Sequence, residues 1–134
     1  GILGDFQAFP RKVCQAISEI LKIVKKHERL KVNLALNYGG RDEILNAVRQ
    51  IIKEKIPVSR LNEKNFSRFL YTNGEPDPDL IIRTGGEIRL SNFLLWQMSY
   101  SELYFTNTLW PDFNEKELDK AIFEYQKRKR NFGK

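Results

Sequence analysis

The stretch that decides the fold is residues 78–111, which read PDLIIRTGGEIRLSNFLLWQMSYSELYFTNTLWP. It opens with an apolar run, Leu80 to Ile82, which is typical of a buried strand. Two glycines at 85–86 then allow the backbone to turn sharply and to approach a ligand closely. Ser91 is suited to the N-cap of a helix over the apolar segment 93–96. The stretch therefore predicts a strand, a tight turn and a helix in quick succession.

Two arginines flank the glycine turn, Arg83 at the predicted strand end and Arg89 just before Ser91. Guanidinium groups, a hydroxyl and a helix N-terminus at the carboxyl end of a strand are typical of sites that bind phosphorylated ligands in α/β folds. A Gly-Gly turn by itself is a weak signal. A second interpretation therefore stays open at this point, an ordinary strand-to-helix turn whose arginines pair with surface acids.

The rest of the chain alternates between helix and strand patterns. Apolar residues spaced by three and four predict amphipathic helices, and short apolar or alternating runs predict strands. The expected helices cover 10–28, 42–53, 63–70 and a segment from Asn114 onward, and the expected strands cover 2–3, 32–36, 80–82 and 102–106. This alternation predicts an α/β fold with a mostly parallel sheet and helices on both faces.

Some helix ends and one helix face can be assigned more finely. Asn62 and Asn114 are suited to cap the third and fourth helices, and Glu117 stands at the capping-box position of the fourth. The second helix carries an apolar face, made by Ile44, Leu45, Val48, Ile51 and Ile52.

The composition is that of one globular domain, with 134 residues, 41% hydrophobic and 30% charged. The net charge of +6 favours anionic partners. The single cysteine, Cys14, excludes an intramolecular disulfide, and its place on an apolar helix face indicates a packed thiol. The only histidine, His27, ends that helix in a basic cluster, and we assign it no catalytic role. No stretch reaches transmembrane length and no signal-peptide pattern is found, so we expect a cytoplasmic protein.

The first residues are unusual for the start of a domain. Ile2 and Leu3 lead directly into Gly4 and Asp5, a pattern typical of the end of a strand and its turn. We therefore expect that the chain begins in the middle of a larger fold.

Several segments together resemble the cis-prenyltransferase family, the undecaprenyl diphosphate synthases. The resemblance covers residues 2–133, and its most specific part runs from Arg83 to Phe113. The motifs that carry it are NYGGR at 37–41, DLIIRTGGE at 79–87, RLSNFLLWQ at 89–97, YSE at 100–102 and WPDF at 110–113.

The resemblance implies an enzyme of cis-prenyl chain elongation, which condenses isopentenyl diphosphate with an allylic diphosphate to make a polyprenyl, here undecaprenyl, diphosphate. It implies that Arg83, Arg89 and Ser91 bind the diphosphate of isopentenyl diphosphate. Leu90, between them, would contribute mainly its backbone. The cofactor implied is Mg²⁺, with Glu102 associated with the metal.

The resemblance also implies a homodimer, formed around residues 102–110, and contact with a membrane surface through the lipid product. A nucleic-acid partner is not expected, because basic and aromatic residues do not interleave in a stacking pattern. The alternative function is a non-catalytic accessory subunit of a heteromeric cis-prenyltransferase. The presence of four residues argues against that alternative, since such a subunit has less need of them: Arg83, Arg89, Ser91 and Glu102.

The chain departs from the family pattern in three places. The family's Asp-Gly-Asn-Gly-Arg segment, which supplies a magnesium-binding aspartate and cradles the allylic diphosphate, has no counterpart here. The family's C-terminal Arg-x-Gly is replaced by Asn-Phe-Gly at 131–133, with Arg130 one residue early, and Ile88 stands where some members carry histidine. We therefore expect residues 1–134 to be the C-terminal portion of a single cis-prenyltransferase domain. This portion would carry the isopentenyl diphosphate half-site and no catalytic residue, and it would be inactive alone.

Overall fold

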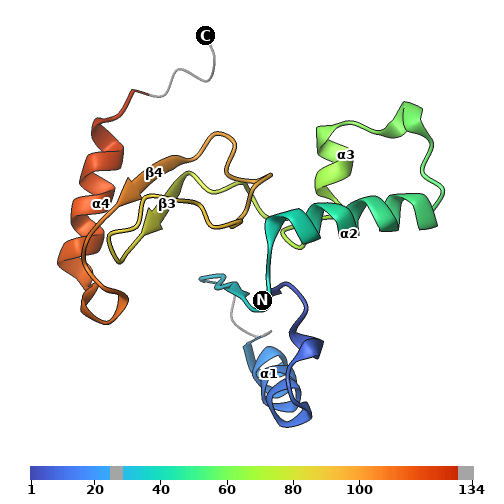
Figure 1. The fold of residues 1–134 in the computed structure, drawn as a ribbon, viewed down its shortest axis with the longest axis horizontal. Coiled ribbons are helices and arrows are strands. Elements are labelled where there is room, and N and C mark those ends of the chain that lie inside the picture. The colour runs from blue at the N-terminus through green and yellow to red at the C-terminus, as the bar shows by residue number, and fades with distance from the viewer. Residues whose placement is uncertain (25–28, 130–134) are drawn as a thin grey trace. The chain divides into compact units, whose positions relative to one another are not determined.

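The structure, a computed structural model, describes residues 1–24 and 29–129 (Figure 1). The chain divides into two compact units, Gly1–Glu75 and Pro76–Lys134. Each unit contains one pair of parallel strands together with one or more helices.

The first unit contains the pairing of β1 (Ile2–Leu3) with β2 (Leu34–Ala35), and the two strands run parallel. Gly4 follows β1 with a φ of +99°, and a Cβ there would lie 2.4 Å from the backbone oxygen of Leu36. Only glycine combines this conformation with so close an approach. The predicted strand end and its glycine turn are therefore confirmed.

The helix between these strands, α1, covers Arg11–Val24 of the predicted helix over 10–28, and residues 25–28 lie outside the described part of the chain. Cys14 packs as predicted. Its Sγ donates to the backbone oxygens of Phe6 at 3.3 Å and Phe9 at 3.2 Å. Residues on the apolar spacing of α1 stay largely open to solvent, as in Ile20, which is 57% exposed.

The second helix, α2 (Gly40–Lys53), buries a face that is shifted from the one that the apolar spacing indicated and shares only Ile51 with it. The side chains buried in its middle are Glu43, Ala47 and Ile51, which are spaced by four residues. Leu45 and Ile52, predicted for the buried face, are 54% and 70% exposed. The face of α2 that packs within the first unit is therefore the face that carries Glu43.

The third helix, α3 (Glu63–Ser67), ends three residues before the predicted end at Leu70. The chain tightens there, because the amides of Phe69 and Leu70 donate to the oxygens three residues earlier instead of four. The predicted cap is confirmed, since the Asn62 side chain accepts from the Asn65 amide at 2.9 Å.

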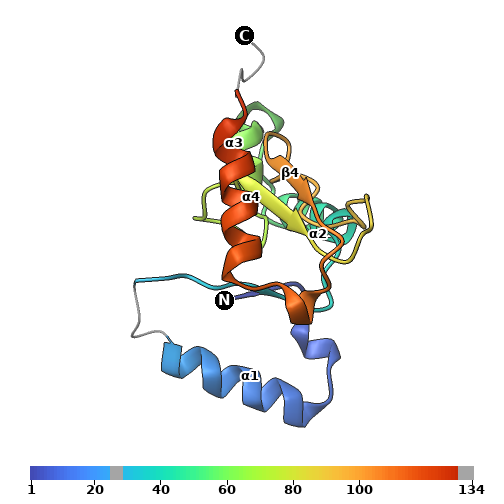
Figure 2. The same cartoon turned by 90° about the vertical axis from the view of Figure 1, so that its left-hand side faces the viewer.

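The second unit pairs β3 (Leu80–Arg83) with β4 (Glu102–Phe105) in parallel, with Leu80 opposite Glu102 and Arg83 opposite Phe105. The helix α4 (Glu115–Lys127) runs beside this strand pair in both ribbon views (Figures 1 and 2). Asn114 caps α4 as predicted, accepting from the amides of Lys116 at 3.0 Å and Glu117 at 3.4 Å. The second half of the predicted capping box is replaced, because the Glu117 carboxylate accepts from Thr108 and Lys120 instead.

The helix predicted over 93–96 is wrong. The segment folds as a series of turns, with positive φ at Ser91 (48°), Asn92 (63°) and Leu94 (42°). A helix N-cap has an extended backbone, so Ser91 does not serve as one. Buried Leu94 and Met98 anchor the loop instead, and this packing outweighs the helical preference of the apolar run.

The α/β class with parallel strands is confirmed. In the described residues the strands form two separate pairs, β1 with β2 and β3 with β4. Short strand pairs of this kind bury little surface by themselves, and every residue of β3 and β4 remains partly exposed.

Candidate functional site

The strongest candidate site lies at the carboxyl end of β3, in the second unit. A pocket of about 160 Å³ opens there, and Arg83, Arg89, Leu90 and Ser91 all line it. The remaining wall is apolar and comes from both strands and the turn-rich loop, namely Ile81, Phe93, Met98 and Phe105. The structure therefore brings together around one cavity the four residues that the sequence nominated for the diphosphate.

The glycine turn that follows Arg83 is fixed to the segment after β4. Gly85 and Gly86 have φ of +89° and +79°, and their amides donate to the oxygens of Thr108 and Thr106, both at 2.9 Å. A Cβ on Gly86 would also lie 3.1 Å from the side chain of Asn107. The turn thus requires glycine for its backbone conformation and holds the end of β3 in place.

Arg83 organises the loop around the pocket. Its Nη1 donates to the backbone oxygen of Arg89 at 2.5 Å and to the hydroxyl of Ser91 at 2.9 Å. A guanidinium group has further N–H donors on Nε and Nη2, so these two bonds leave donors for a ligand. Among the described residues Arg83 has no carboxylate partner.

Arg89 has a different environment. It forms an ion pair with Glu87, and the two side chains are 60% and 51% exposed. Exposed pairs of this kind contribute little free energy, so an anion with more charge than one carboxylate can displace Glu87. The interpretation of the arginines as partners of surface acids therefore holds for Arg89 and not for Arg83.

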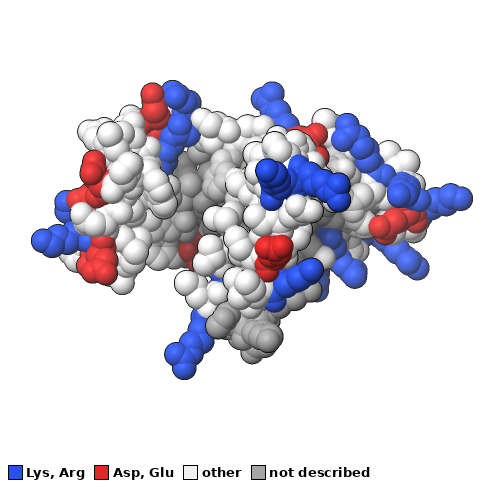
Figure 3. All heavy atoms as spheres, turned by 90° about the horizontal axis from the view of Figure 1, so that it is seen from below, with Lys and Arg blue, Asp and Glu red and all other residues white. Residues whose placement is uncertain are grey.

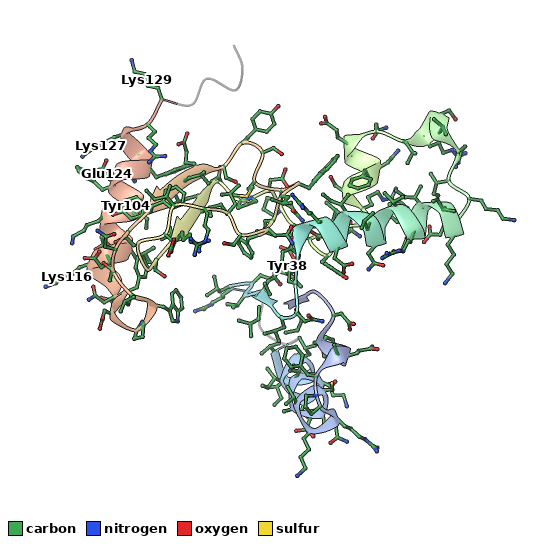
Figure 4. All side chains as sticks on the ribbon, viewed as in Figure 1. Tyr38, Tyr104, Lys116, Glu124, Lys127 and Lys129 are labelled. Atoms are coloured by element: carbon green, nitrogen blue, oxygen red, sulfur yellow. The ribbon has the colours of Figure 1, made fainter. Side chains whose placement is uncertain are left out.

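Glu102, the nominated metal residue, does not line the pocket. It stands opposite Leu80, three residues before the Arg83 position, which is about 10 Å along the strands. Side chains alternate along a strand, so Glu102 and Tyr104 point to the face opposite that of Arg83 and Phe105. Figure 4 shows Tyr104 near α4, and from α4's C-cap the Arg128 guanidinium donates to the Glu102 carboxylate at 2.7 Å.

The environment of Glu102 fits one oxygen ligand of Mg²⁺ and does not fit a complete site. Its carboxylate is engaged by Arg128, and the described residues contain no group of three or more acidic, cysteine or histidine side chains close enough to hold a metal. Mg²⁺ in proteins often takes only one or two carboxylates and completes its shell with phosphate and water. Glu102 could therefore supply one ligand of such a site.

A polar chain connects α4 to the glycine turn. Glu117 accepts from Lys120 Nζ at 2.5 Å and from Thr108 Oγ1 at 3.1 Å, and the Thr108 backbone accepts from Gly85. The bond from Lys120, followed by that from Thr108, lowers the pKa of Glu117, and the same contact raises the pKa of Lys120. Both groups thus remain charged at neutral pH.

A family model described as putative undecaprenyl diphosphate synthase matches residues 1–133. The chain belongs to this family. The isoprenyl transferase of Oceanobacillus iheyensis is 48% identical over 135 residues, a span of 98% of this chain and 54% of that protein. The chain therefore spans about half the length of this member of the synthase family.

Two solved structures share the fold. Lavandulyl diphosphate synthase from Lavandula x intermedia, in complex with dimethylallyl diphosphate, matches with a TM-score of 0.94 and 37% identity, covering 100% of this chain and 59% of that one. A probable undecaprenyl diphosphate synthase from Campylobacter jejuni matches with a TM-score of 0.86 and 41% identity, covering 100% and 62%. The α/β arrangement is thus that of prenyltransferase structures.

Two other predictions concern the C-terminal residues and the absence of a membrane-spanning helix. Arg130 and the Asn-Phe-Gly segment at 131–133 lie outside the described residues. Among the helices that are described, none combines the length and the apolar character that crossing a membrane would need.

Proposed function

We propose that this chain supplies the isopentenyl diphosphate half-site of a cis-prenyltransferase, which condenses isopentenyl diphosphate with an allylic diphosphate to extend a polyprenyl, here undecaprenyl, chain. The observation that carries the proposal is the pocket that Arg83, Arg89 and Ser91 share in a chain of the synthase family. The assignment of residues 1–134 to the C-terminal portion of that enzyme, its cytoplasmic location and its contact with a lipid surface stay predictions.

In the proposed site Arg83 is held in place before the substrate arrives. Its bonds to Arg89 and Ser91 fix the guanidinium plane, so that Nε and Nη2 can bind one phosphate without a large loss of side-chain freedom. Arg89 would leave Glu87 and bind the same diphosphate. The apolar wall, including Phe93 and Met98, would face the isoprenoid carbons.

The catalytic task in this reaction is to bring two substrates together while charge develops on the departing diphosphate. Bound Mg²⁺ would neutralise part of that charge. Within this chain Arg83 and Arg89 would orient isopentenyl diphosphate, and Glu102 would add one oxygen ligand to a metal held mainly by residues beyond those described.

The proposed metal-binding role of Glu102 can be distinguished from its ion pair with Arg128. In a full-length synthase that contains this chain, Glu102→Gln is expected to raise the Mg²⁺ concentration needed for half-maximal activity. Arg128→Gln breaks the same ion pair but keeps the carboxylate, so it should not raise that concentration. Equal Mg²⁺ titrations for wild type and Glu102→Gln would restrict Glu102 to the ion pair.

The proposal includes inactivity of the isolated chain. The 134-residue chain should incorporate no radiolabelled isopentenyl diphosphate into a longer product when it is mixed with farnesyl diphosphate and Mg²⁺, because the residues proposed to hold the allylic substrate are not in it. A full-length relative serves as the positive control. Robust chain elongation by the isolated chain would refute the half-site proposal.

A homodimer is proposed from an exposed apolar surface in the second unit. Leu109 and Trp110 are 60% and 75% exposed, and the Trp110 ring stacks on Phe113 with centroids 6.3 Å apart. An open groove of about 920 Å³ continues from these rings to Leu118. Exposed aromatic surface of this kind is typical of the central residues of protein interfaces.

The dimer is tested by removing the exposed indole. Trp110→Ser is expected to weaken self-association of the chain by about 30-fold or more, since central interface tryptophans contribute about 2 kcal/mol or more. Sedimentation velocity over a range of concentrations measures the dissociation constant. Ile88→Ser, which removes an equally exposed apolar side chain of the same unit, is the control. Similar dissociation constants for both variants would place the interface elsewhere.

A further inference from the structure

A second polar pocket lies in the first unit, apart from the residues that the proposed function uses. It has a volume of about 380 Å³ and forms where the end of α2, the following turn at 58–60 and α3 come together. Its polar lining consists of Gln50, Glu54, Arg60, Asn65, Arg68 and Asn73, and its apolar lining consists of Ile56 and Phe69.

Two guanidinium groups in this pocket are uncommitted. The side chains of Arg60 and Arg68 make no hydrogen bond or ion pair with any other described residue, although Glu54 lines the same cavity. The other polar groups of the lining are amides, which can donate as well as accept. The pocket therefore offers more donors than its single carboxylate can use.

The backbone around these arginines is well fixed. Asn65 donates from Nδ2 to the backbone oxygen of Arg60 at 2.7 Å, and its own amide donates to Asn62. Two residues after Arg68, Leu70 is buried, with 4% exposure. The two guanidinium groups thus extend from anchored positions into the same cavity, which lowers the entropy lost when a ligand orders them.

The charge around the pocket points to an anion. Residues 49–68 contain basic side chains at Arg49, Lys53, Lys55, Arg60, Lys64 and Arg68, against acidic ones at Glu54 and Glu63. Figure 3 shows Lys and Arg side chains gathered on the right, where Figure 1 places α2 and α3. Beside Arg60, Val58 is 83% exposed and Leu61 is 40% exposed.

We infer that this pocket binds a phosphate group, held by the paired guanidinium groups of Arg60 and Arg68. Arginine is the side chain best suited to phosphate, because its planar fork donates two parallel hydrogen bonds. The phosphate is either free in solution or part of a lipid headgroup, and the exposed Val58 and Leu61 suit the second source. This inference does not depend on the proposed function, which concerns a pocket in the other unit.

The test uses the full 134-residue chain in an Arg83→Gln/Arg89→Gln background, so that the other arginine pocket does not contribute. Inorganic diphosphate binding is measured by calorimetry, and binding to vesicles of phosphatidylcholine with or without phosphatidylglycerol is measured by co-sedimentation. Adding Arg60→Gln/Arg68→Gln should weaken the binding of at least one probe by about tenfold or more. The matched control, Arg11→Gln/Arg29→Gln, removes the same charge from residues that do not line the pocket and should have little effect.

The results of these binding measurements distinguish a free phosphate ligand from a lipid headgroup. Loss of diphosphate binding indicates a free phosphate ligand, and loss of binding only to phosphatidylglycerol vesicles indicates a headgroup. The inference is overturned if neither probe binds or if both arginine pairs have equal effects. If the pocket variant does not fold, the side-chain amide signals of Asn65 and Asn73 in the parent chain must shift on addition of either probe, and unchanged signals overturn it.

Discussion

Arg83→Ala in a full-length synthase that contains this chain is expected to lower kcat/KM for isopentenyl diphosphate by about 100-fold, because at least two charge-assisted hydrogen bonds are lost. Part of the loss is direct, since Nε and Nη2 would no longer bind the diphosphate. Part comes through the loop, because Arg83 also holds the backbone oxygen of Arg89 and the hydroxyl of Ser91. Steady-state kinetics with each substrate varied in turn measures kcat/KM for isopentenyl diphosphate and KM for the allylic diphosphate.

The comparison of substrates decides what Arg83 does. The KM of the allylic diphosphate should change little, and equal losses for both substrates would mean that the pocket is misassigned. Arg83→Lys keeps the charge but has no planar fork, so we expect it to recover only part of the activity. Arg49→Ala, at an exposed arginine of the first unit, is the control. Unchanged isopentenyl diphosphate kinetics in Arg83→Ala would favour the accessory-subunit alternative.

Arg89→Ala provides a second variant of the same site, with which the loss of activity in Arg83→Ala can be compared. Arg89 is exposed and already paired with Glu87, whereas Arg83 is partly buried and makes two bonds to the loop. The ranking of the two variants should therefore follow the degree of preorganisation, with the larger loss at Arg83.

The part of this site that could be predicted from sequence is the part that depends on local chemistry. The apolar run of β3 and the two glycines at 85–86 predicted the strand and the turn, since few other residues accept their backbone angles. The convergence of Arg83 with Ser91 also followed from their spacing around that turn. These features need only neighbours along the chain.

The loop that follows Arg89 could not be predicted in the same way. Residues 93–96 have the composition of a helix, yet Ser91, Asn92 and Leu94 adopt left-handed angles that most residues avoid. Such angles persist only where tertiary contacts impose them, here the burial of Leu94 and the hydrogen bond from Arg83 to Ser91. Local sequence propensity predicts neither of these tertiary contacts.

The position of Glu102 depended on strand register. The sequence predicted a strand over 102–106, but its distance and face relative to Arg83 follow only from the pairing of Glu102 with Leu80. Shifting a register by one residue moves every side chain to the other face. The resemblance therefore identified Glu102 as a candidate residue, but its position relative to Arg83 could not be predicted from the sequence.

Glu43→Ala is the second large effect that we expect, and it concerns stability. The Glu43 side chain is 1% exposed, and its carboxylate accepts from the Tyr38 hydroxyl at 2.6 Å and from the Tyr71 amide at 2.8 Å. Figure 4 places Tyr38 at the start of α2, so the glutamate connects this helix end to a segment 28 residues further along the chain. The sequence did not reveal this role, because a glutamate next to Asp42 in the first turn of a helix resembles an ordinary exposed acid.

Removing the carboxylate leaves the Tyr71 amide and the Tyr38 hydroxyl without their acceptor and leaves a void beside Ala47. We expect a loss of about 3 kcal/mol in the free energy of unfolding of the first unit, because bonds to a charged acceptor contribute about 1.5–3 kcal/mol each. Urea unfolding followed by circular dichroism measures it. Two graded variants follow from the geometry: Tyr38→Phe, which removes one bond, should lose about 1.5 kcal/mol, and Glu43→Gln, which keeps an acceptor oxygen, should lie between Tyr38→Phe and Glu43→Ala. Equal stabilities of Glu43→Ala and wild type would show that burial of this carboxylate costs as much as its hydrogen bonds return, and that α2 is held by Ala47 and Ile51 instead.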